Sequence, residues 1–342
     1  MSAGTGFGSF HLFSLPDTKS DRDVVRDEVE EGQWLDELGF DEVWLGEHNA
    51  RVYGMVGSLQ VPAAALAATT KRLRIGASVT RLPLHHPLHT AEDLALVDVI
   101  SNGRFDWGIG KGYDPHEFET YGVPFEERDA RWQEALDIVF SAWRDGRICH
   151  EGTYWTIPET ELFPKPIQRP HPPAFLMVTR SDESVCFAAR RLLPVILGQW
   201  PDWDDARHKL ELYRTTALEA GHSPEQIDAV MTRFGQLRQV HVASTYEQAK
   251  EEYRDGLMWY FATRNNRGMF GFSHQPQPYD YYLQHRSTML GTPDQVADQI
   301  AEYREYTGVN NIICWFNCGG QPHQQVRRAM ELFAAKVMPR LQ

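Results

Sequence analysis

The chain has 342 residues, 42% of them hydrophobic, and a formal net charge of −13 at pH 7. Its length is enough for one large core and fits an α/β barrel with insertions. The acidic charge argues against nucleic acid or an anionic membrane as a partner, and the lack of a signal-peptide pattern or a long apolar run predicts a cytoplasmic protein that spans no membrane.

Short apolar runs alternate with longer amphipathic stretches along the whole chain. The runs are rich in valine, isoleucine, phenylalanine and tryptophan, as buried parallel strands are. They predict strands at residues 9–13, 42–45, 73–79, 104–109, 174–178, 194–197, 237–242 and 311–316. The stretches between them predict helices at residues 22–38, 59–70, 91–100, 128–143, 183–191, 204–220, 246–258, 293–306 and 324–337.

Eight strands, each followed by a helix, are the elements of a (β/α)₈ TIM barrel. A doubly wound sheet is the competing layout. The barrel is favoured because the units continue to the end of the chain without a break in composition, so residues 1–342 are predicted to form a single domain. A long insertion after the seventh strand, residues 260–291, predicts either a mobile lid over the active site or a disordered excursion.

In a TIM barrel the chemistry lies where strands end and loops begin. The second predicted strand runs directly into Glu47, His48 and Asn49. A histidine at that point could act as a base or hydrogen-bond a cofactor, because it titrates near neutral pH, or it could be a satisfied structural residue. Glu47 would either orient the imidazole or neutralise a buried arginine.

Other histidines and the cysteines lack the spacing of a metal site. Three histidines lie in a proline turn after the third strand and are interpreted as loop residues without a carboxylate partner: His85, His86 and His89. No CxxC pair is present, and no nearby histidine completes a zinc pattern. Four reduced, buried thiols and no metal are therefore expected, at Cys149, Cys186, Cys314 and Cys318.

Cations follow the fourth and fifth strands. Lys111 lies in a glycine-rich turn whose spacing is a poor match to a dinucleotide fingerprint, and the turn is better read as presenting the lysine to an anion. Arg180 and Ser181 precede a helix, where free amides favour phosphate, although an ordinary N-cap beside a surface arginine is the alternative. Because neighbouring strand ends converge, these residues predict a phosphate site, away from the usual position after strands seven and eight.

The sequence resembles the bacterial luciferase-like, flavin-dependent monooxygenases over nearly its whole length. The order and spacing of several runs carry the resemblance: GFDEVW at 39–44, Glu47 with His48, LPLHHP at 82–87, SNGRF at 101–105, GTP at 291–293 and FNCGG at 316–320. The resemblance implies a TIM barrel with a mobile insertion after strand seven. It also implies an FMN phosphate held by Lys111, Tyr113, Arg180, Ser181 and Ser184, a non-proline cis peptide at Ser78–Val79 beside the flavin, and His48 as the active-site histidine.

The sequence departs from these relatives at two positions. Asn49 stands where many of them carry a second histidine, and Gly110 stands where the luciferases proper carry a reactive cysteine, which argues against light emission. Gly110 is expected to leave more room beside the flavin ring. Asn49, Gly110 and Trp200 are predicted to line the substrate pocket, with core packing as the other role for Trp200 and for Trp315.

The resemblance implies that reduced FMN reacts with O₂ to give a flavin peroxy or hydroperoxy adduct, which oxygenates a small organic substrate while His48 exchanges protons. The sequence has no pyridine-nucleotide fingerprint, so the reduced flavin is expected from a separate flavin reductase. A homodimer is also expected. Two alternatives are a deazaflavin-dependent hydride-transfer oxidoreductase and a non-catalytic flavin-binding paralogue.

Overall fold

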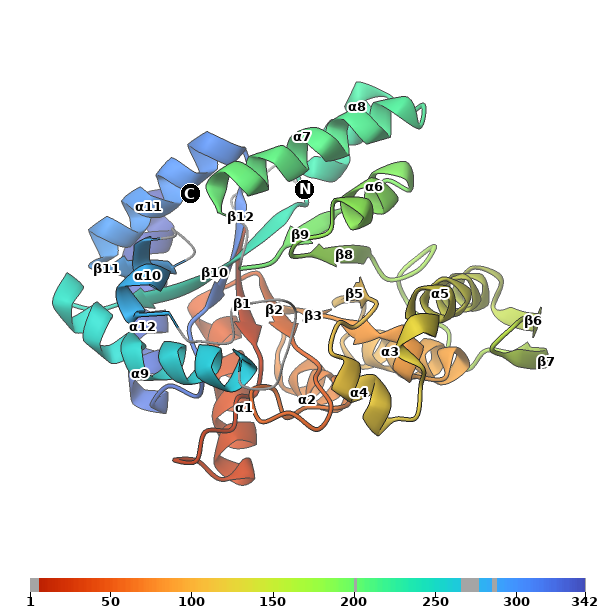
Figure 1. Cartoon of the computed structure of the whole chain (residues 1–342), viewed down its shortest axis with the longest axis horizontal. Coiled ribbons are helices and arrows are strands. Elements are labelled where there is room, and N and C mark those ends of the chain that lie inside the picture. The colour runs from red at the N-terminus through yellow and green to blue at the C-terminus, as the bar shows by residue number, and fades with distance from the viewer. Residues whose placement is uncertain (1–5, 200–201, 266–276, 285–287, 342) are drawn as a thin grey trace.

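The computed structural model describes residues 6–199, 202–265, 277–284 and 288–341. In these residues eight parallel strands close into a barrel surrounded by helices (Figure 1). Each barrel strand lies within two residues of its predicted ends. The strands are β1 (Phe7–His11), β2 (Glu42–Leu45), β3 (Arg74–Ala77), β5 (Phe105–Gly110), β8 (Ala174–Val178), β9 (Val195–Leu197), β10 (Gly235–Val242) and β12 (Asn311–Trp315). The parallel pairings of β1 with β12 and of β10 with both β9 and β12 complete the ring, so the TIM barrel is confirmed.

The predicted helices also form, and local capping signals fix several of their ends. Ser20 caps α1 through a capping box, and the helix ends at Gly39, whose φ of 90° is left-handed. Thr292 does the same at the start of α11, with Pro293 in its first turn. The helices are α1 (Asp21–Leu38), α2 (Gln60–Thr69), α3 (Pro87–Ile100), α5 (Arg128–Asp145), α6 (Asp182–Arg190), α7 (Trp203–Glu219), α9 (Tyr246–Asn265), α11 (Pro293–Thr307) and α12 (His323–Leu332).

Several shorter elements were not expected from the sequence. A hairpin follows α5 at the right edge of Figure 1. The unexpected elements are too short to show a long apolar period in the sequence. These elements are β4 (Thr80–Arg81), η1 (Leu82–Leu84), α4 (Pro115–Thr120), η2 (Phe125–Glu127), β6 (Arg147–Glu151), β7 (Thr156–Glu161), α8 (Pro224–Met231), α10 (Tyr279–Gln284), β11 (Thr288–Gly291) and α13 (Met338–Leu341). The helix predicted at residues 324–337 forms as α12 followed by η3 (Phe333–Val337), a π-helical turn.

The insertion after the seventh strand is more regular than the sequence suggests. Helix α9 runs to Asn265, seven residues beyond its predicted end at 258. The described part of the remainder forms α10 and β11, and β11 pairs with the second half of β10. Residues 266–276 and 285–287, on which the predicted lid also depends, lie outside the described residues.

Two groups of apolar side chains hold the barrel together. One lies between the strands and the outer helices. The other fills the barrel interior with aromatic rings, including Trp44 against Phe175 at 5.1 Å and Phe10 against Trp315 at 5.2 Å between centroids. Edge-to-face contacts of this kind add to the burial of large rings. Among the described helices, none has the length and apolar character needed to cross a bilayer.

Candidate active site

A cavity of about 400 Å³ opens at the carboxyl ends of the strands. Seven of the eight barrel strands contribute to its wall, either directly or through the segment that follows them, as the fold predicts for a TIM-barrel site. The cavity brings together most of the predicted site residues, namely His48, Ser78, Val79, Gly110, Lys111, Tyr113, Arg180, Ser181 and Ser184. Side chains far apart in the sequence therefore share one enclosed space.

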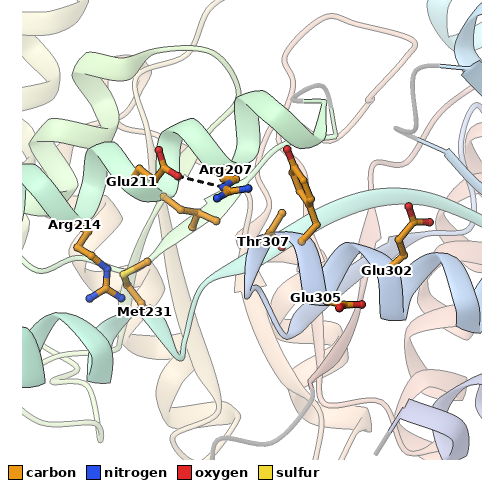
Figure 2. Close-up of a pocket in the computed structure, with 9 residues that line it drawn as sticks. Arg207, Glu211, Arg214, Met231, Glu302, Glu305 and Thr307 are labelled. Atoms are coloured by element: carbon orange, nitrogen blue, oxygen red, sulfur yellow. Dashed lines mark hydrogen bonds and ion pairs between the residues drawn. The ribbon is translucent and has the colours of Figure 1, made fainter.

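A second hollow of about 540 Å³ lies outside the barrel, between α7, α8 and α11 (Figure 2). It shares no lining residue with the first. Its cations are already paired with acids, since Arg207 lies 3.2 Å from Glu211 and Arg214 lies 2.7 Å from Asp228. The hollow is a groove between surface helices and offers no group poised for chemistry.

His48 is held in place by groups on both sides of its ring. Its Nδ1 lies 2.9 Å from Oε1 of Glu117 and 3.2 Å from Oη of Tyr53, while its Nε2 lies 3.4 Å from Oη of Tyr113. The histidine side chain is 11% exposed, and Glu117 is almost fully buried. An ionised carboxylate at Nδ1 favours the tautomer with its proton there, which leaves Nε2 as the atom that faces Tyr113 and the cavity.

Glu117 stays ionised despite its burial. Burial opposes the charged form, but the hydrogen bond with His48 and the charges of His48 and Arg81 lower the pKa of Glu117 to about 2. Arg81 forms an ion pair with Oε2 of Glu117, and the Asn49 backbone donates to Oε1 at 3.0 Å. The carboxylate is therefore a fixed negative charge behind the imidazole.

Arg81 lies at the centre of a buried polar network. It contacts Glu47 at 3.3 Å and the side-chain oxygen of Asn49. Burial acts to lower the pKa of Arg81, but the carboxylates of Glu47 and Glu117 outweigh it and raise the pKa. Glu47 thus neutralises a buried arginine, the second of its two expected roles. It also accepts from Nε2 of His85 at 2.7 Å, so the prediction that this histidine lacks a carboxylate partner was wrong.

Cationic side chains form another part of the cavity wall, the cationic end. Lys111 lies there, 3.0 Å from Asp129, and Arg128 from the start of α5 also lines it. The buried Nε of Arg128 has no hydrogen-bond partner among the described residues. Ser181 caps α6 by accepting from the Ser184 N–H at 3.1 Å, so the N-cap reading holds and is compatible with an anion at that helix start.

The third strand leaves the barrel through a cis peptide between Ser78 and Val79, as the resemblance implied. Both residues line the cavity. The same cavity wall also contains His48 and the cations Lys111, Arg128 and Arg180, so one space is in contact with all of them.

Comparison with known proteins agrees with this geometry. The family model described as luciferase-like monooxygenase matches residues 5–311. The chain belongs to this family. It is 29% identical over 356 residues to the alkanal monooxygenase alpha chain of the Kryptophanaron alfredi symbiont, covering 98% of each chain. A monooxygenase of Streptomyces bottropensis has a similar structure, with a TM-score of 0.88 and 27% identity over 98% of this chain and 100% of that one.

More distant solved structures share the fold. The oxygenating constituent of the 3,6-diketocamphane monooxygenase of Pseudomonas putida, solved in complex with FMN, has a TM-score of 0.84 and 21% identity, with 98% of each chain covered. Coenzyme F420 dependent enzymes are also among the structures with this fold. At these identities the likeness concerns the barrel alone.

Within this luciferase-like barrel, Gly110 does not have the role expected for it. A Cβ at this position would overlap the Cγ2 methyl of Val79 and lie 2.8 Å from its Cβ. The space beside Gly110 is therefore filled by its neighbour, and the expectation of extra room there was wrong. Asn49 is 3% exposed and is not among the cavity-lining residues described; its amide instead binds Arg81, Gly57 and Tyr121.

The expectations for Trp315 and the cysteines are decided by how deeply their side chains are buried. Trp200 lies outside the described residues. Trp315 is fully buried against Tyr260, at 4.7 Å between centroids, and belongs to the barrel core. Cys314 and Cys318 are buried, whereas Cys149 is exposed on the hairpin, so not all four thiols are in the core. All four cysteines are free.

A further cluster lies outside the cavity. The buried group His11, Glu28 and Glu31 has the composition of a metal site, although the sequence predicts none. His11 lies 3.0 Å from Glu28, and Glu31 lies 3.0 Å from His323. Burial alone would lower the pKa of His11, but the charge of Glu28 reverses this and raises it. Burial likewise raises the pKa of Glu31, and each carboxylate lies beside a histidine, Glu28 beside His11 and Glu31 beside His323.

Sequence reasoning missed three residues that complete the site. Glu117 lies on α4, a helix of six residues, which is too short for a periodic signal. Arg81 ends the short strand β4 and Arg128 begins the long helix α5, and both look like surface cations in the sequence. One signal was available for Glu117, since Asp114 followed by proline is a typical helix start and places the glutamate in the first turn.

Proposed function

We propose that the protein is a flavin-dependent monooxygenase that uses reduced FMN and O₂ to oxygenate a small organic substrate. One observation carries the proposal: a single cavity is lined by cationic side chains, by the Ser78–Val79 peptide and by His48, which is paired with the buried Glu117. An anionic, ring-bearing cofactor fits such a space. Membership of the luciferase-like monooxygenase family supports the same reaction class.

The residues present fit the phosphate of FMN. Lys111, Arg128 and Arg180 supply positive charge, while Ser181 and Ser184 lie at a helix start. The unpartnered, buried Nε of Arg128 is a group for which a phosphate oxygen would be a suitable acceptor. When bound there, reduced FMN would supply the electrons that activate O₂, and Ser78 and Val79 would belong to the wall that holds it.

His48 would move a proton at the other end. With Glu117 fixed at Nδ1, Nε2 can accept a proton and return it, and the carboxylate stabilises the imidazolium form in between. Tyr113, expected at the phosphate, instead places its hydroxyl 3.4 Å from Nε2. We assign Tyr113 to this end, where its phenol lies at the cavity wall beside the histidine and can pass the proton on.

The charges at the cationic end favour FMN over a deazaflavin. A deazaflavin cofactor of the coenzyme F420 type carries a long acidic tail beyond its phosphate. Two acids, Asp129 and Glu183, line this end beside the three cations and would repel such a tail. Hydride transfer with a deazaflavin therefore remains the alternative, and the structure gives it less support.

Two exposed apolar surfaces support the expected homodimer. Helix α2 contains no charged residue, and Val61 on its outer side is 70% exposed. The neighbouring α3 exposes Leu96, Val99 and Ile100. Apolar residues on every side of a surface helix indicate a covered face. We propose that α2 and α3 pack against the same helices of a second copy, and that a separate reductase supplies the reduced flavin.

Anaerobic titration with FMN, reduced FMN and a reduced deazaflavin, read by fluorescence or calorimetry, tests the cofactor. Preference for reduced FMN, lost when Lys111 and Arg180 are both changed to alanine, is expected. Preference for the deazaflavin would move the protein to hydride transfer. Binding of reduced FMN that O₂ then re-oxidises in the same way and at the same rate as the free cofactor would make it a non-catalytic flavin-binding protein.

A further inference from the structure

The side chain of Val79 fills the space into which a side chain at position 110 would extend. Gly110 ends β5, and Val79 immediately precedes β4, whose Arg81 pairs with Gly110 across the sheet. The side chain of Val79 projects over the glycine, so a Cβ there would overlap its Cγ2 methyl, lie 2.8 Å from its Cβ and 3.1 Å from its Cγ1. Cβ contacts below about 3.0 Å are sterically prohibitive because cores are packed at van der Waals distance.

The backbone does not require a glycine at position 110. Its φ lies outside the left-handed region that ten other glycines of the described chain occupy. Gly108, two residues earlier, differs in what blocks it, because a Cβ there would overlap the carbonyl oxygen of Ala77. Backbone atoms thus exclude a side chain at position 108, whereas the side chain of one residue excludes it at position 110. Only at position 110 can a substitution of the neighbouring residue make room for a side chain.

Resting on the flavin site proposed above, we infer that Val79 forms, from the adjacent strand, the cavity wall that a side chain at position 110 would otherwise form. Its branched, unreactive methyl groups set how bulky a substrate can be where it meets the flavin ring. With a larger side chain at position 110 and a smaller one at position 79, residue 110 would form this part of the wall in place of residue 79. The two positions together therefore determine how bulky a substrate the cavity accepts.

A double-mutant cycle on the flavin-free protein tests the packing. Gly110→Ala alone should lower the melting temperature by about 3 to 8 °C, the effect of overpacking a core. The decrease in melting temperature caused by Gly110→Ala should be smaller in the Val79→Ala background, where the clash with the Cβ of residue 79 persists. It should nearly vanish in the Val79→Gly background, where that Cβ is absent. If Gly110→Ala does not fold alone, recovery of soluble protein in those backgrounds replaces the melting temperature as the readout.

Two controls make the cycle specific. Val178→Ala removes the same groups from another cavity-lining valine, at the end of β8, and should not rescue Gly110→Ala. Val79→Gly should not rescue Gly108→Ala, because the obstruction at 108 is the Ala77 carbonyl. Equal losses from Gly110→Ala in all three backgrounds at position 79 would overturn the inference, whatever the cofactor.

The substrate part is tested by binding to FMN-loaded protein, with decanal as a slender probe and camphor as a bulky one. The ratio of the camphor dissociation constant to that of decanal should fall at least five-fold in Val79→Ala and further in Val79→Gly, but not in Val178→Ala. An unchanged ratio would overturn the role of Val79 in specificity. Failure of every variant to bind FMN would overturn the proposed function, and the flavin-free cycle would still decide the packing.

Discussion

The Oε1 atom of Glu117 lies 2.9 Å from Nδ1 of His48, while its other oxygen pairs with the buried guanidinium of Arg81. The carboxylate is therefore shared between a titratable ring and a permanent cation. Since the pKa of Glu117 is lowered to about 2, it carries its charge throughout the neutral range and biases His48 toward accepting a proton.

Removing this charge should weaken turnover and change its pH dependence. In Glu117→Gln the amide keeps a hydrogen-bonding oxygen but no longer stabilises the imidazolium, so the acid limb of the rate profile should move about one unit or more toward lower pH. Steady-state O₂ consumption between pH 5 and 9 measures it. A uniform drop at all pH values, with no movement of the limb, would mean that Glu117 acts only on folding.

His48→Ala should lower turnover by about two to four orders of magnitude, the usual contribution of a general acid or base. The affinity for FMN should change little, because the phosphate groups lie at the other end of the cavity. Stopped-flow oxidation of the reduced, FMN-loaded variant and calorimetric titration give the two values. Turnover equal to that of the unmodified enzyme would remove the histidine from the mechanism.

Removal of a positive charge from the cationic end should weaken FMN binding, and removal of a negative charge should strengthen it. Arg128→Ala should weaken FMN binding about ten-fold or more, as loss of a charge-assisted hydrogen bond does, and Asp129→Asn should strengthen it by freeing Lys111. Riboflavin, which has no phosphate, should bind all variants alike. Arg131→Ala is a matched control on the same helix, since Arg131 pairs with Glu127 and lines no part of the cavity. Equal losses of affinity for FMN and riboflavin in Arg128→Ala would mean that Arg128 does not bind the phosphate.

Glu42 should make the barrel less stable as the pH rises. Burial, opposed by a hydrogen bond from Asn311, raises the pKa of Glu42 to about 7. The folded chain then holds a proton that the unfolded chain releases near pH 4.5, so stability falls between about pH 4.5 and 7 and stays low above. Glu42→Gln removes this loss, and its advantage in free energy of unfolding should grow by up to about 3 kcal/mol between pH 5 and 8. Urea denaturation at both pH values measures this advantage, and a constant one would contradict the assignment.

The α2–α3 surface should control assembly. Leu96→Glu combined with Val61→Glu should convert a dimer to monomers, because two buried carboxylates would face their symmetry mates. Leu218→Glu on α7 is a matched control, since both leucines are 47% exposed. Sedimentation of the three proteins distinguishes them. A dimer that survives the double substitution would have to use another face.

Much of the barrel follows from local sequence, whereas much of the site does not. Strand ends such as those before His48 and Lys111 are marked by apolar runs, and the fold alone then brings them together. Glu117 and Arg81 could not be assigned, since their roles depend on contacts across 32 or more residues. Gly110 shows the same limit, because the residue that fills its space, Val79, lies in a distant segment between β3 and β4.

Strand β10 has two different neighbours along one edge. Its first two residues pair with β9 and its second half pairs with β11 from the insertion, while β12 lies along the opposite edge. The excursion that leaves the barrel after β10 thus comes back to hydrogen-bond the strand it left. A chain cut short between β10 and α11 would leave the end of β10, Val240 to Val242, with unpaired backbone donors and acceptors. The insertion therefore contributes a strand to the sheet, and a chain without it would need another strand at that place.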